Sequence, residues 1–366
     1  MTNTIQDILP VANRIIDEYP LCTNCLGRLF VNSLHLRSSE ILGSKIFKLL
    51  NKSAILPCFI CKNIFVDIYK YVDMVISESI PYQFSTFVAG TIIKPSICDR
   101  DDLIRSRFHL LGSRAIKTDV TGKISSIFAR KTHTKLDSHK PDLIILINLS
   151  KQICFVKSAP FFVFGRYTKH HRGIPQSSFD DDVESIQKTI NDFLYKEFLN
   201  KDSRYVWIGS EDSQSLVSGN GRPFFVKLLN PKKRNIKINF MKNKFIHVQQ
   251  LRVIPQIPPS PIKFQSTISA VITTDVPIST FKLSALRNLS GSKVSTLQKS
   301  GMVVKTIHRL SYRRLLKNSI KLLITVDGGF PIQRFIADSD TTPNLSELLD
   351  CKCTCLHFDI KNVELL

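Results

Sequence analysis

The sequence has no apolar run long enough to cross a membrane and no recognisable secretory signal. No stretch approaches the roughly 18 apolar residues that a membrane-spanning helix needs. The N-terminus MTNTIQDILP has neither the basic start nor the apolar segment of a signal peptide. Acidic residues are also scarce, because 30 Asp and Glu stand against 51 Lys and Arg, a net charge of +21. We therefore expect no membrane association, a location in the cytoplasm or nucleus, and a polyanionic partner, with RNA or DNA first.

The shortage of acidic residues is concentrated in one part of the chain. With 366 residues, 43% of them hydrophobic, the chain is long and apolar enough for two domains, which excludes a wholly disordered protein. Between Asp212 and Asp327 the only carboxylate is Asp275, while about 20 Lys and Arg fall in the same interval, seven of them within 227–244. Bound phosphates would explain such a tract by counterion release. The alternative is an ordinary basic surface in a lysine-rich proteome.

Apolar periodicity predicts an α/β first part and a largely antiparallel second part. Spacing near 3.6 residues predicts helices over 5–18, 39–51 and 66–79, and a β-branched run predicts a strand over 83–93. The runs 142–148 and 152–156 predict a hairpin. Farther along, short strands alternate with turns, and helices are predicted at 182–199 and 343–350. We expect an α+β protein with domains at 1–144 and 145–366.

Nine cysteines in a chain without a secretory signal favour free thiols or a metal site over disulfides. Cys22 and Cys25 form one C-x-x-C pair, and Cys58 and Cys61 form another. Two such pairs supply the four thiolates of a tetrahedral structural zinc site. Four ordinary buried cysteines are the alternative. The C-x-C-x-C run at 351–355 would face one side of a strand and is interpreted as structural.

Several segments, in order along the chain, resemble one protein family. LCTNCLGRLF at 21–30 and PCFICKNIF at 57–65 resemble its cysteine pairs. FFVFGRYTKHHRGIPQ at 161–176 is close to F-I-Y-G-R-Y-x-K-x-x-R-G-I-P-Q. GSEDSQSLVSGNGRPF at 209–224 resembles G-R-E-D-x-D-x-x-x-L-G-x-G-R-P-F, and KTIHRLSYRR at 305–314 resembles K-T-x-x-R-V-x-H-R-R. The family comprises the archaeal and eukaryotic tRNA pseudouridine synthases with a THUMP-related N-terminal domain, which modify uridine 55, and in some members uridine 54, of the tRNA T-arm.

The resemblance implies a zinc-bearing, tRNA-binding THUMP-like α/β domain followed by a catalytic domain on a mostly antiparallel sheet. It implies a monomeric isomerase that needs no cofactor for catalysis. The target uridine is flipped out, its glycosidic bond is broken, and the ring is rejoined through carbon with help from one aspartate. Asp212 matches that aspartate and would act as nucleophile or base. A role for Asp212 in capping a turn is the alternative.

The resemblance also implies substrate contacts outside the catalytic aspartate. Cations mixed with aromatic rings suit phosphate contact and base stacking. Two basic segments are therefore expected to be loops that grip tRNA, and ordinary solvated loops are the alternative. The first contributes Arg166, Tyr167, Lys169 and Arg172, and the second contributes Lys305, Arg309, Arg313 and Arg314. Arg222 belongs to a glycine-rich loop near the site, and Ile268 and Phe330 are expected to line the uracil pocket.

The chain departs from the family pattern at the predicted site. Ser210 stands where the family has an arginine that holds the aspartate, and Ile268 and Phe330 replace tyrosines. Both replacements lack a hydroxyl that could assist proton transfer. Candidate basic partners for Asp212 are then Arg309, Arg313 and Arg334.

Two further function classes stay open beside the enzyme. One is a catalytically impaired tRNA-binding protein or RNA chaperone of the same fold. The other is a DNA-binding factor that uses the cysteine pairs, although no recognition-helix pattern follows them.

Overall fold

The computed structural model describes residues 4–178, 183–235, 240–298, 301–337 and 340–366. The chain forms two compact units, Met1–Ala159 and Pro160–Leu366, and each has its own apolar core. The boundary differs from the expected one at residue 144, which falls inside a strand of the first unit. That strand pairs with two others of the same sheet, so the hairpin after it also belongs to the first unit. None of the described helices has the length and apolar character of a membrane span.

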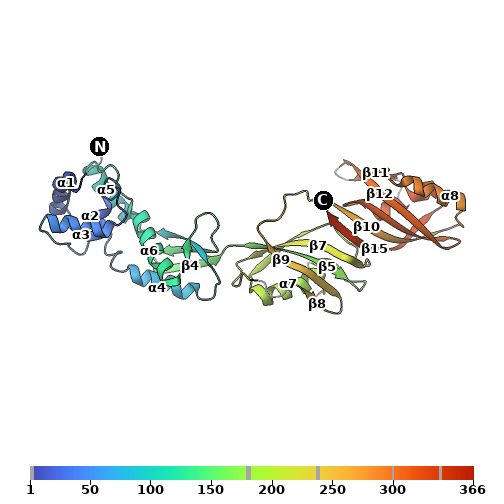
Figure 1. Ribbon diagram of the computed structural model, residues 1–366, viewed down its shortest axis with the longest axis horizontal. Helices are drawn as coiled ribbons and strands as arrows, with labels where there is room; N and C mark the ends of the chain where they lie inside the picture. Colours follow the sequence, from blue (N-terminus) through green and yellow to red (C-terminus); the bar gives the residue numbers. More distant parts are fainter. Residues whose placement is uncertain (1–3, 179–182, 236–239, 299–300, 338–339) are drawn as a thin grey trace. The chain divides into compact units, whose positions relative to one another are not determined.

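The first unit combines helices with a four-stranded sheet of order β2-β1-β3-β4 (Figure 1). Strand β1 pairs in parallel with β2 and β3, whereas β3 and β4 form the predicted antiparallel hairpin. The three helices that periodicity predicts are present, and α2, α5 and α6 are additional. The helices are α1 (Ile5–Glu18), α2 (Thr23–Arg28), α3 (Ser39–Leu49), α4 (Ile68–Ser79), α5 (Pro95–Arg107) and α6 (Ile116–Thr132). The strands are β1 (Thr86–Ile92), β2 (Lys135–Leu136), β3 (Leu143–Asn148) and β4 (Ile153–Ser158).

Two glycines let α2 and α3 pack backbone against backbone. A Cβ on Gly27 would lie 1.7 Å from the carbonyl oxygen of Ser39, and one on Gly43 would lie 1.9 Å from that of Thr23. Only glycine permits this approach. The close packing fixes the start of α2, where Cys22 acts as N-cap and its sulfur accepts the backbone N–H of Cys25.

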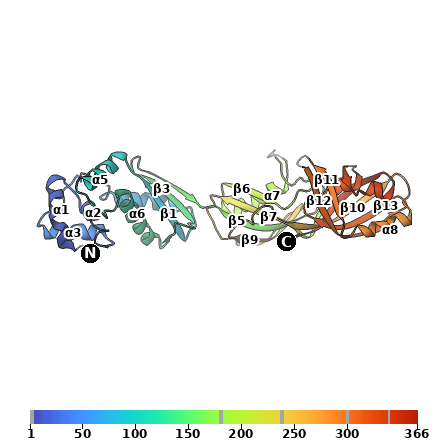
Figure 2. The ribbon, with the colours of Figure 1, turned by 90° about the horizontal axis from the view of Figure 1, so that it is seen from above.

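The second unit is built on an eleven-stranded sheet of order β14-β11-β12-β13-β10-β15-β7-β5-β9-β8, with β6 on β7. All pairings between these described strands are antiparallel except β15 with β7, which run parallel through the pair Ile360 and Val217. This joint divides the sheet into two halves (Figures 1 and 2). The expectation of a mostly antiparallel sheet is confirmed.

The elements of the second unit have the following bounds. The strands are β5 (Phe161–Lys169), β6 (Asp202–Trp207), β7 (Val217–Leu229), β8 (Met241–Lys242), β9 (Ile246–Ile254), β10 (Phe264–Thr274), β11 (Lys293–Gln298), β12 (Gly301–Leu316), β13 (Ser319–Asp327), β14 (Thr341–Thr342) and β15 (Cys353–Leu365). The helices are α7 (Ile186–Phe198), α8 (Thr280–Ala285), α9 (Ile332–Ala337) and α10 (Leu345–Leu349), with a 3₁₀ turn at Leu286–Leu289.

Helix α7 forms because its apolar residues recur every four positions. Ile186, Ile190, Leu194 and Phe198 are all buried in the core of the second unit, and the Ser185 hydroxyl caps the helix. The helix was predicted to begin at residue 182, which lies outside the described residues.

The two segments that were expected to be loops lie mostly in strands. Residues 166–169 of the first segment belong to β5, which lies between β7 and β9, whereas 170–172 follow the strand. Residues 305–314, the second segment, lie within β12, which pairs with β13. A strand sends alternate side chains to opposite faces of its sheet. Neighbouring residues of these two segments therefore have different surroundings, which decides which of their cations can reach a ligand.

Candidate active site

A cavity of about 440 Å³ opens where the segment between β6 and β7 meets β10, β13 and β15. Asp212, Ile268 and Phe330 all line it, so the structure brings together the catalytic and base-contacting residues that the sequence predicts. Further apolar walls come from Phe264 and Phe358, and the volume lies in the range of small-molecule sites. The cavity is large enough for one nucleoside and combines apolar side chains with polar ones.

Asp212 is held by hydrogen bonds from two different elements. One carboxylate oxygen accepts the backbone N–H of Gln214 at 2.8 Å, and the other lies 3.3 Å from the amide nitrogen of Gln333 on α9. Within the described part of the chain Asp212 has no ion-pair partner. The basic partners that were expected for Asp212, which are Arg309, Arg313 and Arg334, therefore form no ion pair with it.

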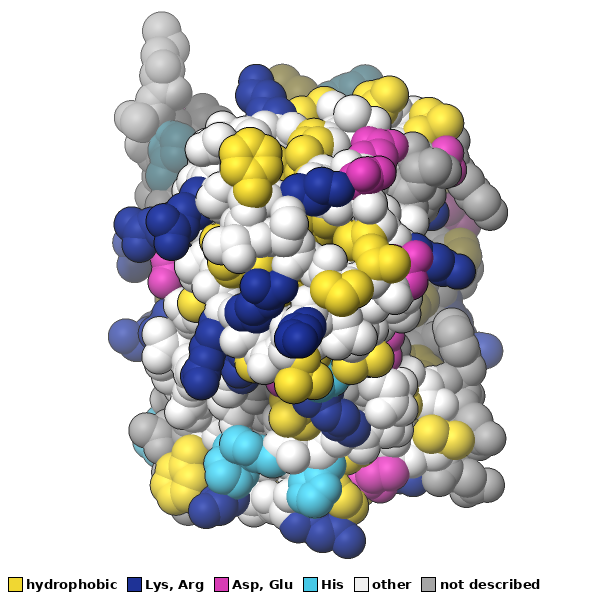
Figure 3. Space-filling model, turned by 90° about the vertical axis from the view of Figure 1, so that its right-hand side faces the viewer, with side chains coloured by type: hydrophobic (Ala, Val, Ile, Leu, Met, Phe, Trp, Pro, Cys, Tyr) yellow, Lys and Arg dark blue, Asp and Glu magenta, His cyan; other side chains and the backbone are white. Residues whose placement is uncertain are grey.

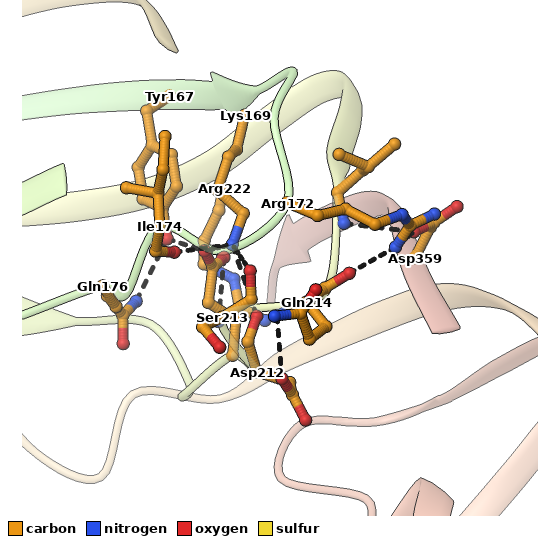
Figure 4. Close-up of polar contacts among 12 residues, drawn as sticks. Tyr167, Lys169, Arg172, Ile174, Gln176, Asp212, Ser213, Gln214, Arg222 and Asp359 are labelled. Atoms are coloured by element: carbon orange, nitrogen blue, oxygen red, sulfur yellow. Dashed lines mark hydrogen bonds and ion pairs between the residues drawn. The ribbon is translucent and has the colours of Figure 1, made fainter. Parts of the chain in front are cut away.

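A buried group of polar side chains lies behind the Asp212 segment (Figure 4). Glu211 has no exposed side-chain surface, and one of its oxygens is 3.0 Å from the ammonium of Lys169. Its other oxygen accepts the hydroxyl of Tyr167 at 2.9 Å and lies 3.8 Å from the Arg222 guanidinium. Burial, together with the Glu211 carboxylate, raises the pKa of Tyr167 well above its usual value. The phenol therefore stays protonated, and its hydroxyl donates a hydrogen bond to Glu211.

The first basic segment is therefore mostly structural, which corrects the expectation that it grips tRNA. Tyr167 and Lys169 are 0% and 1% exposed, so they cannot contact RNA. Arg166 donates to the carbonyl oxygens of Gly221 and Val363 at 2.9 and 2.8 Å and ties three strands together. The cause is the position of β5 in the interior of the sheet.

Arg172 and Arg222 lie at opposite ends of the Asp212 segment. Arg172 is exposed, forms a 2.9 Å ion pair with Asp359 and donates to the carbonyl of Gln214. Burial opposes ionisation of Asp359, but hydrogen bonds from the Leu216 N–H and Arg172 hold its pKa below the usual value. Arg222 lines the cavity, is 3% exposed, and donates to the carbonyl of Gly209 at 3.1 Å.

The second basic segment, on β12, has two kinds of cation. Lys305 donates to the carbonyl of Gly328 at 2.6 Å, in the turn that leads to Phe330, and Arg314 donates to backbone carbonyls nearby. Arg309 and Arg313 are exposed on the strand. Lys and Arg side chains are spread over this end of the second unit and acidic ones are fewer (Figure 3). Lys237, from the basic tract at 227–244, lies outside the described residues.

The first unit contains a cluster of four buried cysteines. The sulfurs of Cys22, Cys25, Cys58 and Cys61 lie within 4.8 Å of one another, and those of Cys22 and Cys61 are 3.7 Å apart. A tetrahedral ion with metal–sulfur distances of about 2.3 Å requires edges of about 3.8 Å, so the cluster fits. Burial by itself raises the pKa of the Cys25 thiol, and four thiolates here therefore require a bound cation. The four cysteines are positioned to hold a metal ion.

Sequence reasoning did not find all residues of the site. Glu211 is next to the catalytic candidate in the GSED string, yet nothing in the string shows that its side chain is buried. Gln333 reaches Asp212 from a helix more than a hundred residues away, and no local pattern signals this contact.

Comparison with known proteins agrees with this arrangement. The family model described as "Pus10, C-terminal" matches residues 162–364, and "Pus10 THUMP domain, archaeal" matches residues 71–148. The tRNA pseudouridine synthase Pus10 of Nitrosopumilus maritimus is 36% identical over 379 residues, which is 99% of both chains. Those of Cenarchaeum symbiosum and Thermofilum pendens are 30% and 23% identical, covering 94% and 96% of this chain and 90% and 94% of theirs.

The fold and the matches define the chain as a pseudouridine synthase that carries a THUMP domain. It belongs to the Pus10 family of tRNA pseudouridine synthases, as the resemblance predicted.

Proposed function

We propose that this protein converts uridine 55 in the T-arm of tRNA to pseudouridine, with Asp212 as the catalytic residue. The observation that carries the proposal is the cavity, which combines one carboxylate without an ion-pair partner among the described residues with apolar walls of nucleoside size. Curated relatives over nearly the whole chain are named tRNA pseudouridine synthases, which supports tRNA as the substrate.

The reaction follows from what lines the cavity. The flipped uracil would lie against Ile268 and the ring of Phe330. The bond between N1 and the ribose C1′ breaks, C5 bonds to C1′, the C5 proton leaves, and N1 gains a proton. Asp212 would act on the sugar or the base, as nucleophile or as base. Nη2 of Arg222 donates no hydrogen bond to a described residue, so it can bind a carbonyl or hydroxyl of the substrate.

The tRNA itself would be held by exposed cations and by the first unit. Arg172, Arg309, Arg313 and Arg314 are the predicted contacts that remain exposed, although Arg314 also donates to backbone carbonyl oxygens. Such side chains would neutralise phosphates of the tRNA, in keeping with the basic character of the chain, whose net charge is +21. We also propose that the metal held by the four cysteines is zinc, because four thiolates in a closed tetrahedral set are typical of structural zinc.

Tritium release from tRNA labelled at C5 of uridine, together with chemical mapping of positions 54 and 55, tests this function. Wild type should release tritium from position 55, and Asp212→Asn should lose at least about a thousandfold in rate, as expected when a nucleophile or base is removed. Asp192→Asn is the control, because Asp192 is exposed on α7, away from the cavity lining. Equal rates for Asp212→Asn and wild type would contradict the assignment.

The second candidate is a tRNA-binding protein without catalysis. It is favoured by one observation: the described cavity lining contains no tyrosine, since Ile268 and Phe330 occupy the expected places. This candidate predicts tight tRNA binding by wild type with no modification at either position.

A further inference from the structure

Lys169, which forms a buried ion pair with Glu211, lies against the segment that carries Asp212 and donates to the carbonyl oxygens of Asp212 and Ser213 (Figure 4). We propose that this pair is a positioning device for the Asp212 main chain and takes no part in binding RNA. The inference rests on the proposed catalytic role of Asp212, and it goes further by naming what holds that residue in place.

The ammonium of Lys169 is fully occupied by the protein. Besides Glu211 at 3.0 Å, it donates to the carbonyl oxygens of Ile174 at 3.0 Å and Ser213 at 3.1 Å, and that of Asp212 is 3.3 Å away. An ammonium has three N–H groups, so four oxygens around it leave no donor for a substrate. Three of those oxygens belong to the backbone of two different segments, which the side chain therefore clamps together.

The carboxylate of Glu211 supplies the negative charge that allows the Lys169 ammonium to be buried between the two segments. A buried ammonium without an anionic partner is strongly unfavourable, and Glu211 is that partner. Its second oxygen accepts the Tyr167 hydroxyl, which in turn accepts the amide of Gln176 at 3.1 Å. The same amide lies 3.3 Å from the carbonyl oxygen of Gly209, so the network reaches the beginning of the segment as well.

Consecutive side chains of this segment differ in exposure. Both residues line the cavity, but the Glu211 side chain has no exposed surface, whereas Asp212 is partly exposed. An anchor at Glu211 therefore fixes the backbone from which the reactive carboxylate projects. Displacement of a catalytic group by about 1 Å costs on the order of a hundredfold in rate. Loss of the clamp should lower the rate of the chemical step without changing affinity for tRNA.

The test uses Lys169→Met, Lys169→Arg and the double variant Lys169→Met/Glu211→Gln in the full chain. Single-turnover rates at saturating tRNA, tRNA affinity over a range of salt concentrations, and amide hydrogen exchange over 209–216 are measured. Both Met-containing variants should lose about a hundredfold in rate, bind tRNA within about threefold of wild type, and exchange faster over 209–216. Lys169→Arg should be intermediate, because it keeps the charge but not the donor geometry.

The double variant keeps the test decisive if Lys169→Met alone fails to fold, since it leaves no unpaired buried Glu211 charge. Lys196→Met is the matched control, because Lys196 is exposed on α7, and it should change none of the three measurements. The inference is overturned if the folded double variant keeps the wild-type rate or exchange. It is also overturned if loss of Lys169 lowers the slope of tRNA affinity against salt at an unchanged rate. Failure of the proposed function shows separately, as full activity in Asp212→Asn or as none in wild type, and the exchange measurement still tests the clamp in that case.

Discussion

Removal of one thiolate from the metal centre is expected to unfold the first unit and leave the second unit folded. The change is Cys58→Ser, at a residue that is fully buried within the four-cysteine cluster. Structural zinc contributes about 10–16 kcal/mol in small domains. This matches or exceeds the whole free energy of unfolding of a typical domain, about 5–15 kcal/mol. The first unit therefore cannot keep its fold once the metal is lost.

Metal binding by the four cysteines is also expected to depend on a positive charge next to them. Four thiolates and a divalent ion carry a net charge of −2, and Arg28 lies one helical turn after Cys25 with 0% of its side chain exposed. Its Nη1 contacts Asp101 at 2.5 Å, while its Nε and Nη2 have no hydrogen-bond partner among the described residues. Arg28→Met should lower the affinity for the metal about 10–100-fold, the usual effect of removing a group that supports metal ligands, as competition with a chelator would show.

Metal analysis and thermal unfolding of the full chain check these expectations. Wild type should hold one zinc per chain and unfold in two steps, and chelation or Cys58→Ser should abolish the step that belongs to the first unit. Cys98→Ser is the control, because Cys98 packs on the same core but lies outside the cluster. Absence of stoichiometric metal in wild type, or equal effects of the two serine substitutions, would refute the reasoning.

Three further changes test the catalytic unit. Gly219→Ala should lose more than the about 1–2 kcal/mol of a left-handed backbone, since φ is +62° and the new Cβ would lie 2.2 Å from the Lys361 carbonyl oxygen; urea unfolding measures this. The pKa of Asp359 is lowered in the folded state, so the hydrogen bond from the Leu216 N–H and the ion pair with Arg172 stabilise the protein above about pH 4, and this contribution is lost as the pH falls. Asp359→Asn should therefore be less stable than wild type at pH 7, with the difference shrinking at pH 3, and a constant difference would contradict this. Arg309→Ala should lower the slope of log affinity for tRNA against log salt by about one without changing stability, as filter binding at several salt concentrations would show.

The parts of the fold that the sequence predicts are those with local signals. Helix α1 begins and ends where periodicity places it, because its buried residues recur at helical spacing and its first turn is capped locally. The two C-x-x-C pairs predict the cysteine cluster, since each pair forms one turn and the cluster requires only that the turns meet. The motifs predict that Asp212, Ile268 and Phe330 share one site, and all three line one cavity.

The parts that sequence reasoning misses depend on partners distant in the chain. Residues 166–172 were expected to be a basic loop because they contain cations, yet a cation can lie in an interior strand when a carboxylate from another segment is buried beside it. Lys169 is such a case, and its partner Glu211 carries no signal of its own burial. The boundary between the units differs from the expected one for a similar reason, because β3 is held in the first unit by pairing with β1, where Leu143 lies opposite Phe87.

Basic residues in a sequence do not by themselves predict contacts with RNA, because their side chains can be used inside the protein. Arg166, Lys169, Lys305 and Arg314 were all assigned to RNA, and all four donate to backbone carbonyl oxygens of the protein. A strand places alternate residues on opposite faces, so about half of its cations cannot face the same ligand. The dependence of tRNA affinity on salt should therefore reflect far fewer phosphate contacts than the excess of basic residues suggests. A slope that accounted for all of these cations would mean that the buried Lys169 reaches the RNA, and the placement of β5 in the sheet interior would then be wrong.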